Sequence, residues 1–368
     1  MDNFLFRKDF STNNYFGEES LPEFGNLCSQ YDNLLVFADE FVFSLHQNFL
    51  QNILAQSRID YEVFSLPRGE DAKDIDLWKN LTNKIMEKGL SRKSAVVAIG
   101  GGAISDFSGF FASTCMRGLD HIIFPTTVLA MVDAALGGKT AINNKAGKNM
   151  VGTWHFPEAV FFLPAFLGTL TGRELLSGLG EMVKHSILGS AELFEELQAF
   201  LEIFEYWQDF DKESNFTLVE KIFPLVISAQ KIKMEIVQKD PFQHNLRYIL
   251  NFGHSAGHAL EALSNYKLLH GIAVLQGMRT ELEIGLEYFN FPQKDFELIV
   301  SFLDSLLESE SIKSDYEGFR KYLVRDKKNL KKSTIISLPS GLGKFESASF
   351  LKKVDPLWFA NTNLFRDG

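Results

Sequence analysis

The chain has 368 residues, of which 45% are hydrophobic and 23% are charged. These values are ordinary for globular proteins and exclude a disordered or collagen-like chain, and the length suits two domains. The 47 acidic and 37 basic residues give a formal charge of −10. That charge argues against a nucleic-acid partner or an anionic membrane, although a local basic pocket for a small anion is compatible with it.

The two cysteines, Cys28 and Cys115, are too few for a disulfide framework and form no CxxC pair, so we expect a reducing compartment. The stretch from Met1 to Lys8 shows no signal-peptide pattern. No run approaches the roughly 18 apolar residues of a membrane helix. We therefore expect a cytoplasmic protein with no membrane partner.

The first 165 residues alternate between short apolar runs and helical patterns, which is typical of an α/β fold with a parallel sheet and crossover helices. Helical patterns cover about 41–55 and 70–88, and the second stops at Gly89, a suitable C-cap. Functional sites in such sheets lie beyond the carboxyl ends of the strands. The apolar runs that we predict as strands are 34–38, 61–65, 95–99, 122–124 and 159–163.

After about residue 170 the strand signals nearly vanish, so we predict a mostly α-helical second domain. Thr171 and Glu174 form a capping-box pattern that opens a helix. A late alternating segment, 334–338, is compatible with one strand. Amphipathic stretches cover about 191–207, 214–238, 246–264, 272–288 and 294–307.

Three glycines, 100–102, follow an apolar strand and precede a helical pattern, where backbone amides can meet a phosphate. The dinucleotide fingerprint requires a third spaced glycine at position 105, and Ser105 stands there. A tight turn without a ligand fits this motif equally well.

A second glycine-rich stretch, 137–149, carries Lys139 and Lys148 and resembles the end of a phosphate-binding loop. The Walker A pattern fails because Asp133 occupies the position of its first glycine. The two lysines therefore indicate either anion capture on a loop or two solvated surface charges.

His254 and His258 stand four residues apart and share one helical face, and His270 follows soon after. With a carboxylate from elsewhere, such as Glu181, these imidazoles would make a metal site with an open position. Ordinary core or surface histidines are the alternative. Several basic residues lie in the same half of the chain: Lys184, Lys233, Arg247 and those of the 325–328 stretch. Each one is compatible with a solvated surface charge. Together, around a metal, they would form a pocket for an anionic, polyhydroxylated substrate.

Taken together, these motifs resemble the 3-dehydroquinate synthase family of sugar-phosphate cyclases. Each motif alone is ambiguous, but the ordered set spans nearly the whole chain and is specific. The matching segments are Arg68–Lys73, Gly100–Asp106, Met116–Gly118, Pro125–Thr127, Asp133, Gly137–Thr140, Gly147–Asn149, Gly180–Lys184, Leu250–His258, Leu269–Gly271 and Asp326–Lys328.

The resemblance implies a Rossmann-like NAD-binding domain over 1–168, a helical metal- and substrate-binding domain over 169–368, and a site in the cleft between them. It implies Glu181, His254 and His270 as ligands of Zn²⁺ or Co²⁺. Helical spacing alone would add His258 to the metal, whereas the family uses the matching histidine for the substrate. The implied substrate residues are Arg117, Asp133, Lys139, Asn149, Lys184, Lys233, Arg247, Asn251, His258 and one of Lys327 and Lys328.

The implied NAD site extends over several segments of the first domain. Asp39, at the end of the first predicted strand, is an acid placed to reach an adenosine ribose. The other implied NAD-binding residues are Arg68, Gly69, Glu70, Asp71, Ala72, Lys73, Gly102, Ala103, Ile104, Ser105, Asp106, Thr126, Thr127, Lys139, Lys148, Phe166, Leu167, Gly168 and Thr169.

By resemblance, the chain would convert 3-deoxy-D-arabino-heptulosonate 7-phosphate, a sugar-phosphate substrate of the shikimate pathway, to 3-dehydroquinate and phosphate, as a homodimer. The family does this by transient oxidation with NAD, phosphate elimination, re-reduction and intramolecular aldol closure. The alternatives are a cyclase for sedoheptulose 7-phosphate or an amino analogue, a metal-dependent polyol dehydrogenase, and an inactive binding protein. Arg247 and Asn251 agree with a carboxylate-bearing substrate, because a guanidinium can bind two oxygens.

Several positions depart from the family's commonest pattern, among them Ala256 and the loop over 240–245. Ser105 replaces a glycine in the phosphate turn. Ile272 follows His270 where a glutamate is frequent, which leaves that ligand without its usual orienting neighbour. His185 stands where an aromatic is common, and we expect it on a helix surface rather than on the metal.

Overall fold

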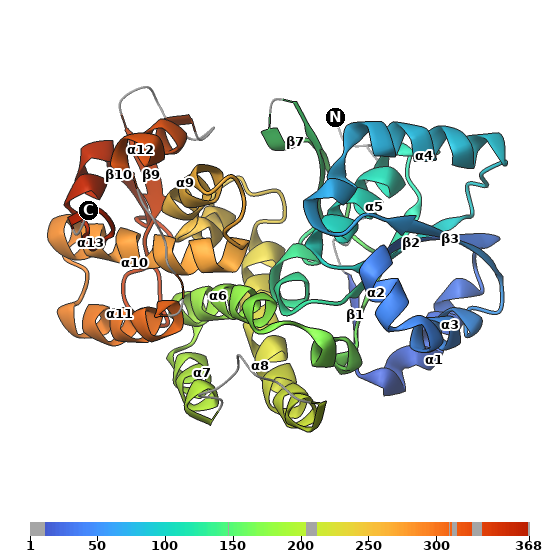
Figure 1. Ribbon diagram of the computed structural model, residues 1–368, viewed down its shortest axis with the longest axis horizontal. Coiled ribbons are helices and arrows are strands. Elements are labelled where there is room, and N and C mark those ends of the chain that lie inside the picture. Colours follow the sequence, from blue (N-terminus) through green and yellow to red (C-terminus); the bar gives the residue numbers. More distant parts are fainter. Residues whose placement is uncertain are drawn as a thin grey trace. The chain divides into compact units, whose positions relative to one another are not determined.

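The computed structural model describes residues 12–145, 147–203, 212–308, 310, 315–325 and 333–366. The chain forms two compact units, residues 1–170 and 171–368 (Figure 1). Within the described ranges, no helix has the length and apolar character needed to cross a membrane.

The first unit is built on a six-stranded sheet in which every neighbouring pair of strands is parallel. All five predicted strands are confirmed, and the sheet has one more, β1, whose first two residues are asparagines, so that it carries no apolar run. In sheet order the strands are β1 (Asn13–Phe16), β8 (Ala159–Phe162), β5 (Asp120–Pro125), β4 (Ala95–Gly100), β2 (Asn33–Asp39) and β3 (Asp60–Leu66).

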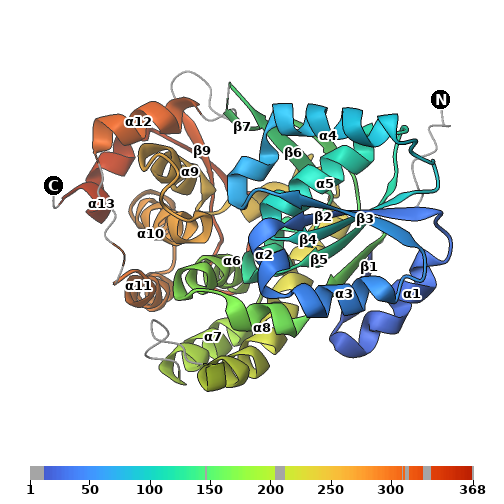
Figure 2. The ribbon, with the colours of Figure 1, turned by 45° about the vertical axis from the view of Figure 1, so that its right-hand side comes forward.

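Helices cover both faces of this sheet, with α4 and α5 on one face and α1 and α3 on the other (Figure 2). The predicted helix over 41–55 is two helices, because the backbone turns at His46. The predicted helix over 70–88 begins as a 3-10 turn, Gly69–Lys73, and continues as α4 after the Asp74 cap. The helices of the unit are α1 (Leu21–Cys28), α2 (Glu40–Leu45), α3 (Gln47–Ala55), α4 (Ile75–Glu87) and α5 (Gly102–Thr114).

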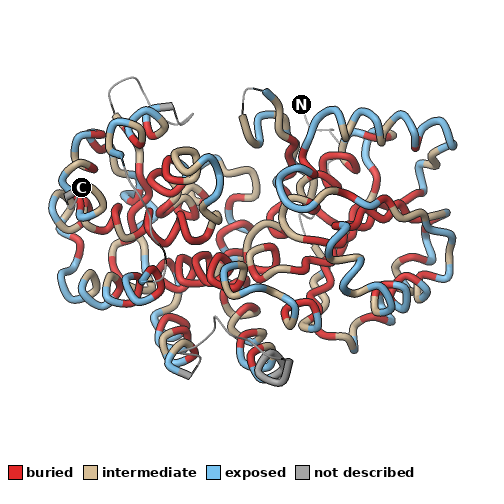
Figure 3. Tube along the Cα trace, viewed as in Figure 1, coloured by how far each residue is buried: buried red, intermediate tan, exposed pale blue. Residues whose placement is uncertain are grey.

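The central strands are buried along their whole length, as parallel strands covered on both faces must be (Figure 3). Aromatic residues fill much of the core beneath them. Phe24 meets Phe124 and Phe161 edge to face, and Phe124 stacks on Phe161 with ring centroids 4.9 Å apart. This rigid core fixes where the loops at the carboxyl ends of the strands begin.

The glycine-rich stretch that we interpreted as a loop is instead an antiparallel hairpin, β6 (Lys139–Asn144) and β7 (Gly147–Trp154). Its strands are rich in polar residues and glycine, so the sequence carries little apolar alternation to indicate them. Thr140 and Thr153 join the two strands through their hydroxyls at 2.7 Å. Lys139 thus lies at the first residue of one strand and Lys148 near the start of the other.

The second unit is mostly helical, as predicted. The capping box at Thr171 and Glu174 is present with both of its hydrogen bonds. The predicted strand at 334–338 exists as β9 (Thr334–Ser337) and pairs with β10 (Leu351–Val354). The helices are α6 (Gly172–Gly189), α7 (Ala191–Ile203), α8 (Lys212–Lys239), α9 (His254–Leu263), α10 (His270–Phe289), α11 (Gln293–Leu307), α12 (Tyr316–Arg325) and α13 (Asn363–Arg366).

The predicted helix over 246–264 is interrupted. A 3-10 turn, Leu246–Asn251, ends before Gly253, whose φ of +77° breaks the helix and lets α9 start at His254. A Cβ at Gly253 would lie 2.5 Å from the Cγ of Met278, so α9 packs against α10 at a distance that only glycine permits. The break places a histidine at the first residue of α9, and another begins α10.

Candidate active site

Three ligand-type side chains converge in the second unit from three helices. Glu181 belongs to α6, and His254 and His270 are the first residues of α9 and α10. Their ligand atoms all lie within 4.8 Å of one another. Oε1 of Glu181 is 3.6 Å from Nε2 of His254 and 3.5 Å from Nε2 of His270. Ligands about 2.1 Å from a tetrahedral Zn²⁺ are about 3.4 Å apart, so these separations fit a divalent metal.

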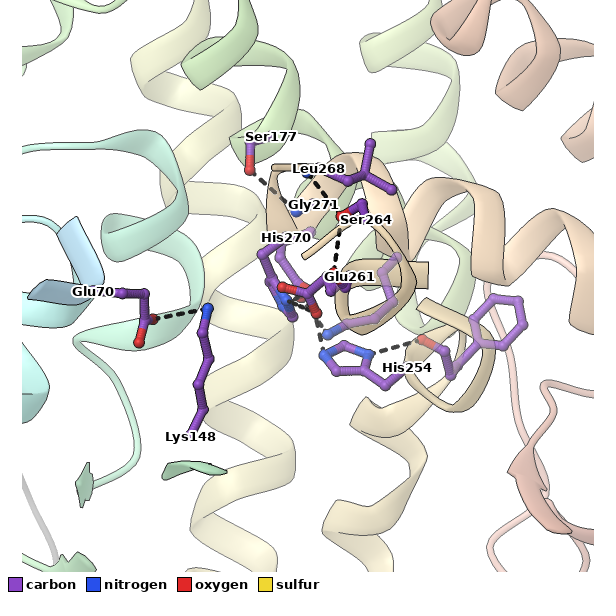
Figure 4. Close-up of polar contacts among 12 residues, drawn as sticks. Glu70, Lys148, Ser177, His254, Glu261, Ser264, Leu268, His270 and Gly271 are labelled. Atoms are coloured by element: carbon purple, nitrogen blue, oxygen red, sulfur yellow. Dashed lines mark hydrogen bonds and ion pairs between the residues drawn. The ribbon is translucent and has the colours of Figure 1, made fainter. Parts of the chain in front are cut away.

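The approach of α6 to α10 is set by two glycines. A Cβ at Gly180 would lie 2.3 Å from the carbonyl oxygen of Gly271, and one at Gly271 would lie 1.7 Å from that of Ser177. The Gly271 N–H donates to the Ser177 hydroxyl at 3.1 Å (Figure 4). Because Glu181 follows Gly180 and His270 precedes Gly271, this backbone contact brings the two ligands together.

The two oxygens of Glu181 face different partners. Oε1 faces the two histidines, whereas Oε2 pairs with Lys184 and lies 3.8 Å from Nε2 of His185. The side chains of Glu181, Lys184 and His185 are at most 1% exposed. The expectation of a surface position for His185 was therefore wrong, because α6 is buried on all sides at this point. Because Lys184 pairs with Oε2, Oε1 is the carboxylate oxygen placed to bind a metal.

Each histidine is held through its second ring nitrogen. Nδ1 of His270 lies 3.2 Å from Oε2 of Glu261 on α9, and Nδ1 of His254 lies 3.2 Å from the carbonyl oxygen of Phe252 (Figure 4). Such outer contacts orient metal-binding imidazoles. Ile272, which lacks a carboxylate, is fully buried, and α9 supplies the carboxylate instead. Sequence reasoning missed Glu261, although its seven-residue spacing from His254 places both on one helical face.

The charges around the two imidazoles differ. Burial acts to lower the pKa of His270, but the carboxylates of Glu181 and Glu261 outweigh it and raise the pKa to about 10. For His254, burial and the Lys184 ammonium hold the pKa well below its usual value. Two carboxylates thus meet at His270, and this concentration of negative charge is what a divalent cation would neutralise.

His258 is exposed, and its ring centroid lies 5.2 Å from that of His254 and 5.9 Å from that of His270. It also forms a ligand group with Glu261 and His270. Glu181 lies in one ligand group with His254 and His270, and His258 lies in another, so helical spacing alone would have added His258 to the metal ligands.

Three of the predicted substrate-binding side chains of the second unit, Lys184, Lys233 and Arg247, are buried although they are charged. Lys233 of α8 and Arg247 of the 246–251 turn are 4% and 2% exposed. Asp240 shapes the preceding loop by accepting N–H groups from His244, Asn245 and Arg247. These bonds outweigh the effect of burial and lower the pKa of Asp240. Lys327 and Lys328 lie outside the described residues.

Asn251 ends the same turn, and its Nδ2 is buried without a hydrogen-bond partner among the described residues. A buried amide donor is costly to leave unpaired. Its position two residues before Gly253, near the start of α9, makes it a candidate to receive a hydroxyl or carboxylate oxygen of a bound ligand.

In the first unit, Lys73 joins three segments. Its side chain is 2% exposed, pairs with Asp106 of α5 at 2.5 Å and donates to Oδ1 of Asn149 on β7. Burial raises the pKa of Asp106, an effect that Lys73 opposes. Asn149 has a positive φ of 55°, which presents its amide toward this pair.

The hairpin is held by a second set of contacts beside Lys73. Asn143 donates to Oε2 of Glu70 at 2.8 Å and accepts from the Asn149 N–H at 2.9 Å. Lys148 lies 3.9 Å from Oε1 of Glu70 (Figure 4). Sequence reasoning placed Glu70, Lys73, Asp106, Lys148 and Asn149 in the site, and the structure brings these five together; it missed Asn143, which carries no motif signal.

The glycine turn joins the carboxyl end of β4 to α5. A Cβ on Gly102 would lie 2.7 Å from that of Ala134, so close packing alone accounts for this glycine. No side chain caps the N-terminus of α5. At the end of the neighbouring β5, the Thr126 hydroxyl is buried without a partner among the described residues. Thr127 instead accepts the Ala130 N–H at 3.1 Å. These groups can receive a phosphate or ribose.

Other predicted residues have structural partners of their own. Asp39 caps α2 through Oδ1, with burial raising its pKa, and Arg68 lies over the Phe41 ring. Phe166 is part of the core, and Thr169 bonds His46 at 2.9 Å. The remaining predicted positions of the 68–73, 102–106 and 166–169 segments lie in the 3-10 turn Gly69–Lys73, the first turns of α5 and the 3-10 turn Pro164–Thr169.

Arg117 is not brought to the Lys73 cluster. It lies in the turn between α5 and β5, with a positive φ of 71°. That turn precedes β5, whereas Thr126 follows it. Arg117 therefore lies at the amino ends of the parallel strands, and the glycine turn lies at their carboxyl ends. Asp133 lies in the helical turn Ala130–Ala134, and Lys139 lies over the Trp154 ring at 5.8 Å.

Comparison with known proteins matches the chain to two family models. The model described as 3-dehydroquinate synthase N-terminal covers residues 63–177, and the one described as 3-dehydroquinate synthase C-terminal covers residues 178–329. The 3-dehydroquinate synthase of Thermoanaerobacter sp. (strain X514) is 37% identical over 345 residues, which are 91% of this chain and 93% of that protein.

Two solved structures share the fold at 24% identity. One is 2-deoxy-scyllo-inosose synthase complexed with carbaglucose-6-phosphate, NAD⁺ and Co²⁺, with a TM-score of 0.84 over 97% of both chains. The other is 2-epi-5-epi-valiolone synthase from Streptomyces hygroscopicus subsp. jinggangensis 5008 with NAD⁺ and Zn²⁺, with a TM-score of 0.81 over 98% of this chain and 97% of that one. The predicted two-part α/β and helical fold is thereby confirmed.

Proposed function

Because this chain belongs to the 3-dehydroquinate synthase family, we propose that it converts 3-deoxy-D-arabino-heptulosonate 7-phosphate to 3-dehydroquinate and phosphate. NAD and a Zn²⁺ or Co²⁺ ion are part of the proposal. The observation that carries it is the convergence of Glu181, His254 and His270 beside the buried ammonium of Lys184. A redox cofactor by itself would not require three metal-ligand side chains, and a metal site by itself would not require the buried lysine beside them.

The ligand chemistry supports both cofactors. One carboxylate oxygen and two imidazole nitrogens suit Zn²⁺ or Co²⁺ with a position left open. We assign the uncapped N-terminus of α5 and the Thr126 hydroxyl to NAD, because a helix N-terminus attracts phosphate. When bound, the metal acidifies a substrate hydroxyl and NAD takes up and returns a hydride, which leaves no net oxidation.

The chain's own residues would bind and orient the substrate. Arg247 suits the carboxylate because its planar group can bind two oxygens, and Asn251 supplies an amide donor. Lys184 places a positive charge beside the metal ligands. In a site that excludes water, this charge would strongly stabilise the negative charge that develops on a substrate oxygen. We assign Lys139, Lys233 and His258 to the remaining phosphate and hydroxyl groups.

The test uses purified protein reconstituted with Zn²⁺ or Co²⁺ and supplied with NAD⁺ and the heptulosonate phosphate. Phosphate release, 3-dehydroquinate and NADH absorbance are followed together. Equal amounts of phosphate and 3-dehydroquinate without net NADH would support the proposal. NADH accumulation without phosphate would favour a polyol dehydrogenase instead. Turnover of sedoheptulose 7-phosphate, but not of the heptulosonate, would favour another cyclase.

We further propose that the protein works in the cytoplasm as a homodimer. Both cysteines are free and buried, in keeping with a reducing compartment. Light scattering of the purified protein would test the dimer, because a dimer has twice the 41.7 kDa mass of one chain. A single-chain mass at working concentrations would contradict it.

A further inference from the structure

Glu281 is a fully buried acid on α10 that has no place in the chemistry described so far. It lies eleven residues after His270, about three helical turns along the same face. Oε2 accepts the Gly253 N–H at 2.9 Å, and Oε1 accepts the Ala256 N–H at 3.2 Å. Gly253 is the N-cap of α9 and Ala256 lies in its first turn, so the carboxylate of one helix caps the other.

The cap is needed because α9 cannot supply its own. Its N-cap residue is Gly253, which has no side chain to accept the first N–H groups. A serine or aspartate cannot replace it, since a Cβ there would lie 2.5 Å from Cγ of Met278 and 2.8 Å from the carbonyl oxygen of Val274. Gly253 and Ala256 are themselves buried, so water is a poor substitute.

The capped turn carries His254. The two N–H groups that Glu281 binds flank this residue in the chain, at positions 253 and 256. The imidazole of His254 is held by the carbonyl oxygen of Phe252, which belongs to the same turn. Displacement of the turn would therefore move both the Cα of His254 and the oxygen that orients its ring.

We propose that Glu281 is a positioning residue that holds His254 for metal binding, and this inference rests on the metal site proposed above. The α10 helix thereby supplies one metal ligand directly, His270, and locates the other through Glu281. The negative charge of the carboxylate also suits the positive end of the α9 dipole.

The isosteric variant Glu281→Gln tests this. It offers one acceptor oxygen where the carboxylate offers two, and its NH₂ group would face an N–H donor. The affinity for Co²⁺ is measured by competition with a chelator, together with the Co²⁺ absorption bands, on protein shown to be folded by circular dichroism. We expect a loss of about 10–100-fold in affinity and shifted bands.

A matched control separates positioning from a general loss of capping. Asp315 caps α12 through the N–H groups of Glu317 and Gly318 at 3.2 and 3.0 Å. The variant Asp315→Asn should leave Co²⁺ affinity and absorption unchanged. Wild-type affinity and bands in folded Glu281→Gln would overturn the inference, and so would equal losses in both variants.

A second variant keeps the test decisive if Glu281→Gln does not fold. Glu281→Asp retains the charge but withdraws the oxygens by one methylene group, and it should weaken Co²⁺ binding. Wild-type affinity and bands in Glu281→Asp would then overturn the inference. His270→Ala tests the ligand set separately, because unchanged Co²⁺ binding there would show that the proposed metal site has failed, whatever Glu281 does.

Discussion

Nδ1 of His270 lies 3.2 Å from Oε2 of Glu261, while Nε2 on the other side of the ring faces Glu181 at 3.5 Å. The imidazole therefore connects a proposed metal ligand to a carboxylate behind it. This arrangement fixes the tilt of the ring.

The variant Glu261→Gln should weaken Zn²⁺ or Co²⁺ binding by about 10–100-fold, because an amide holds the ring less strongly than a carboxylate does. Chelator competition measures this. Glu287→Gln, which removes an exposed acid from α10, is the charge control. Equal metal affinities in the two variants would refute an orienting role for Glu261.

The variant Lys184→Met should destabilise the metal-free protein by about 3–5 kcal/mol, because it removes the buried ammonium that pairs with Oε2 of Glu181. Added Zn²⁺ should recover much of that loss by supplying positive charge. Urea unfolding with chelator and with Zn²⁺ measures both effects. Lys321→Met, at an exposed position, should show neither. A loss that Zn²⁺ does not reduce would contradict the proposed proximity of metal and Glu181.

The variant Lys73→Met should also cost about 3–5 kcal/mol, since it removes the buried partner of Asp106. Calorimetry should in addition show weaker NAD binding, because Asn149 and Asp106 lose their common contact. Lys88→Met breaks a pair with Glu62 whose side chains are 52% and 41% exposed, so it should cost at most about 1 kcal/mol. Similar losses in the two variants would argue against a special role for Lys73.

The variant Asn251→Ala should raise KM for the heptulosonate phosphate by about tenfold, the equivalent of one hydrogen bond. Nδ2 has no partner among the described residues, so its removal should change the free energy of unfolding by less than about 1 kcal/mol. Steady-state kinetics and urea unfolding test the two statements. Asn80→Ala, on the exposed side of α4, is the control. An unchanged KM would remove Asn251 from the substrate site.

His121 should make the first unit sensitive to acid. Burial, with a smaller effect of His155, holds its pKa well below 6.5, and neither ring nitrogen has a hydrogen-bond partner among the described residues. The unfolded chain therefore binds a proton that the folded chain does not. Its contribution to stability is complete above about pH 6.5 and falls below it by up to about 1.4 kcal/mol per pH unit.

The comparison of wild type with His121→Leu isolates this effect. The difference in unfolding free energy between the two proteins should be constant from pH 7 to 8 and should shift in favour of the variant as the pH falls from 6.5 to 5. A difference that is constant over the whole range would show that His121 does not titrate as its burial requires.

Local patterns in the sequence were sufficient for much of this fold. The five predicted strands follow from apolar runs bounded by turn residues, and the start of α6 follows from Thr171 and Glu174, which are three residues apart. Interactions of this kind are complete within a few residues, so they can be read without knowing the packing. Glu181, His254 and His270 were predicted as metal ligands through the resemblance to a known family, because spacing alone also offered His258.

Tertiary structure decided what depends on residues far apart in the chain. No local signal shows that Glu281 caps α9, that Glu261 rather than residue 272 supports His270, or that α6 is enclosed so fully that His185 is buried. The hairpin over 139–154 has polar strands, and its contact with Lys73 spans 76 residues. The helix contacts of the second unit follow from close packing at Gly180, Gly253 and Gly271, because burial and backbone approach determine which polar groups must satisfy one another.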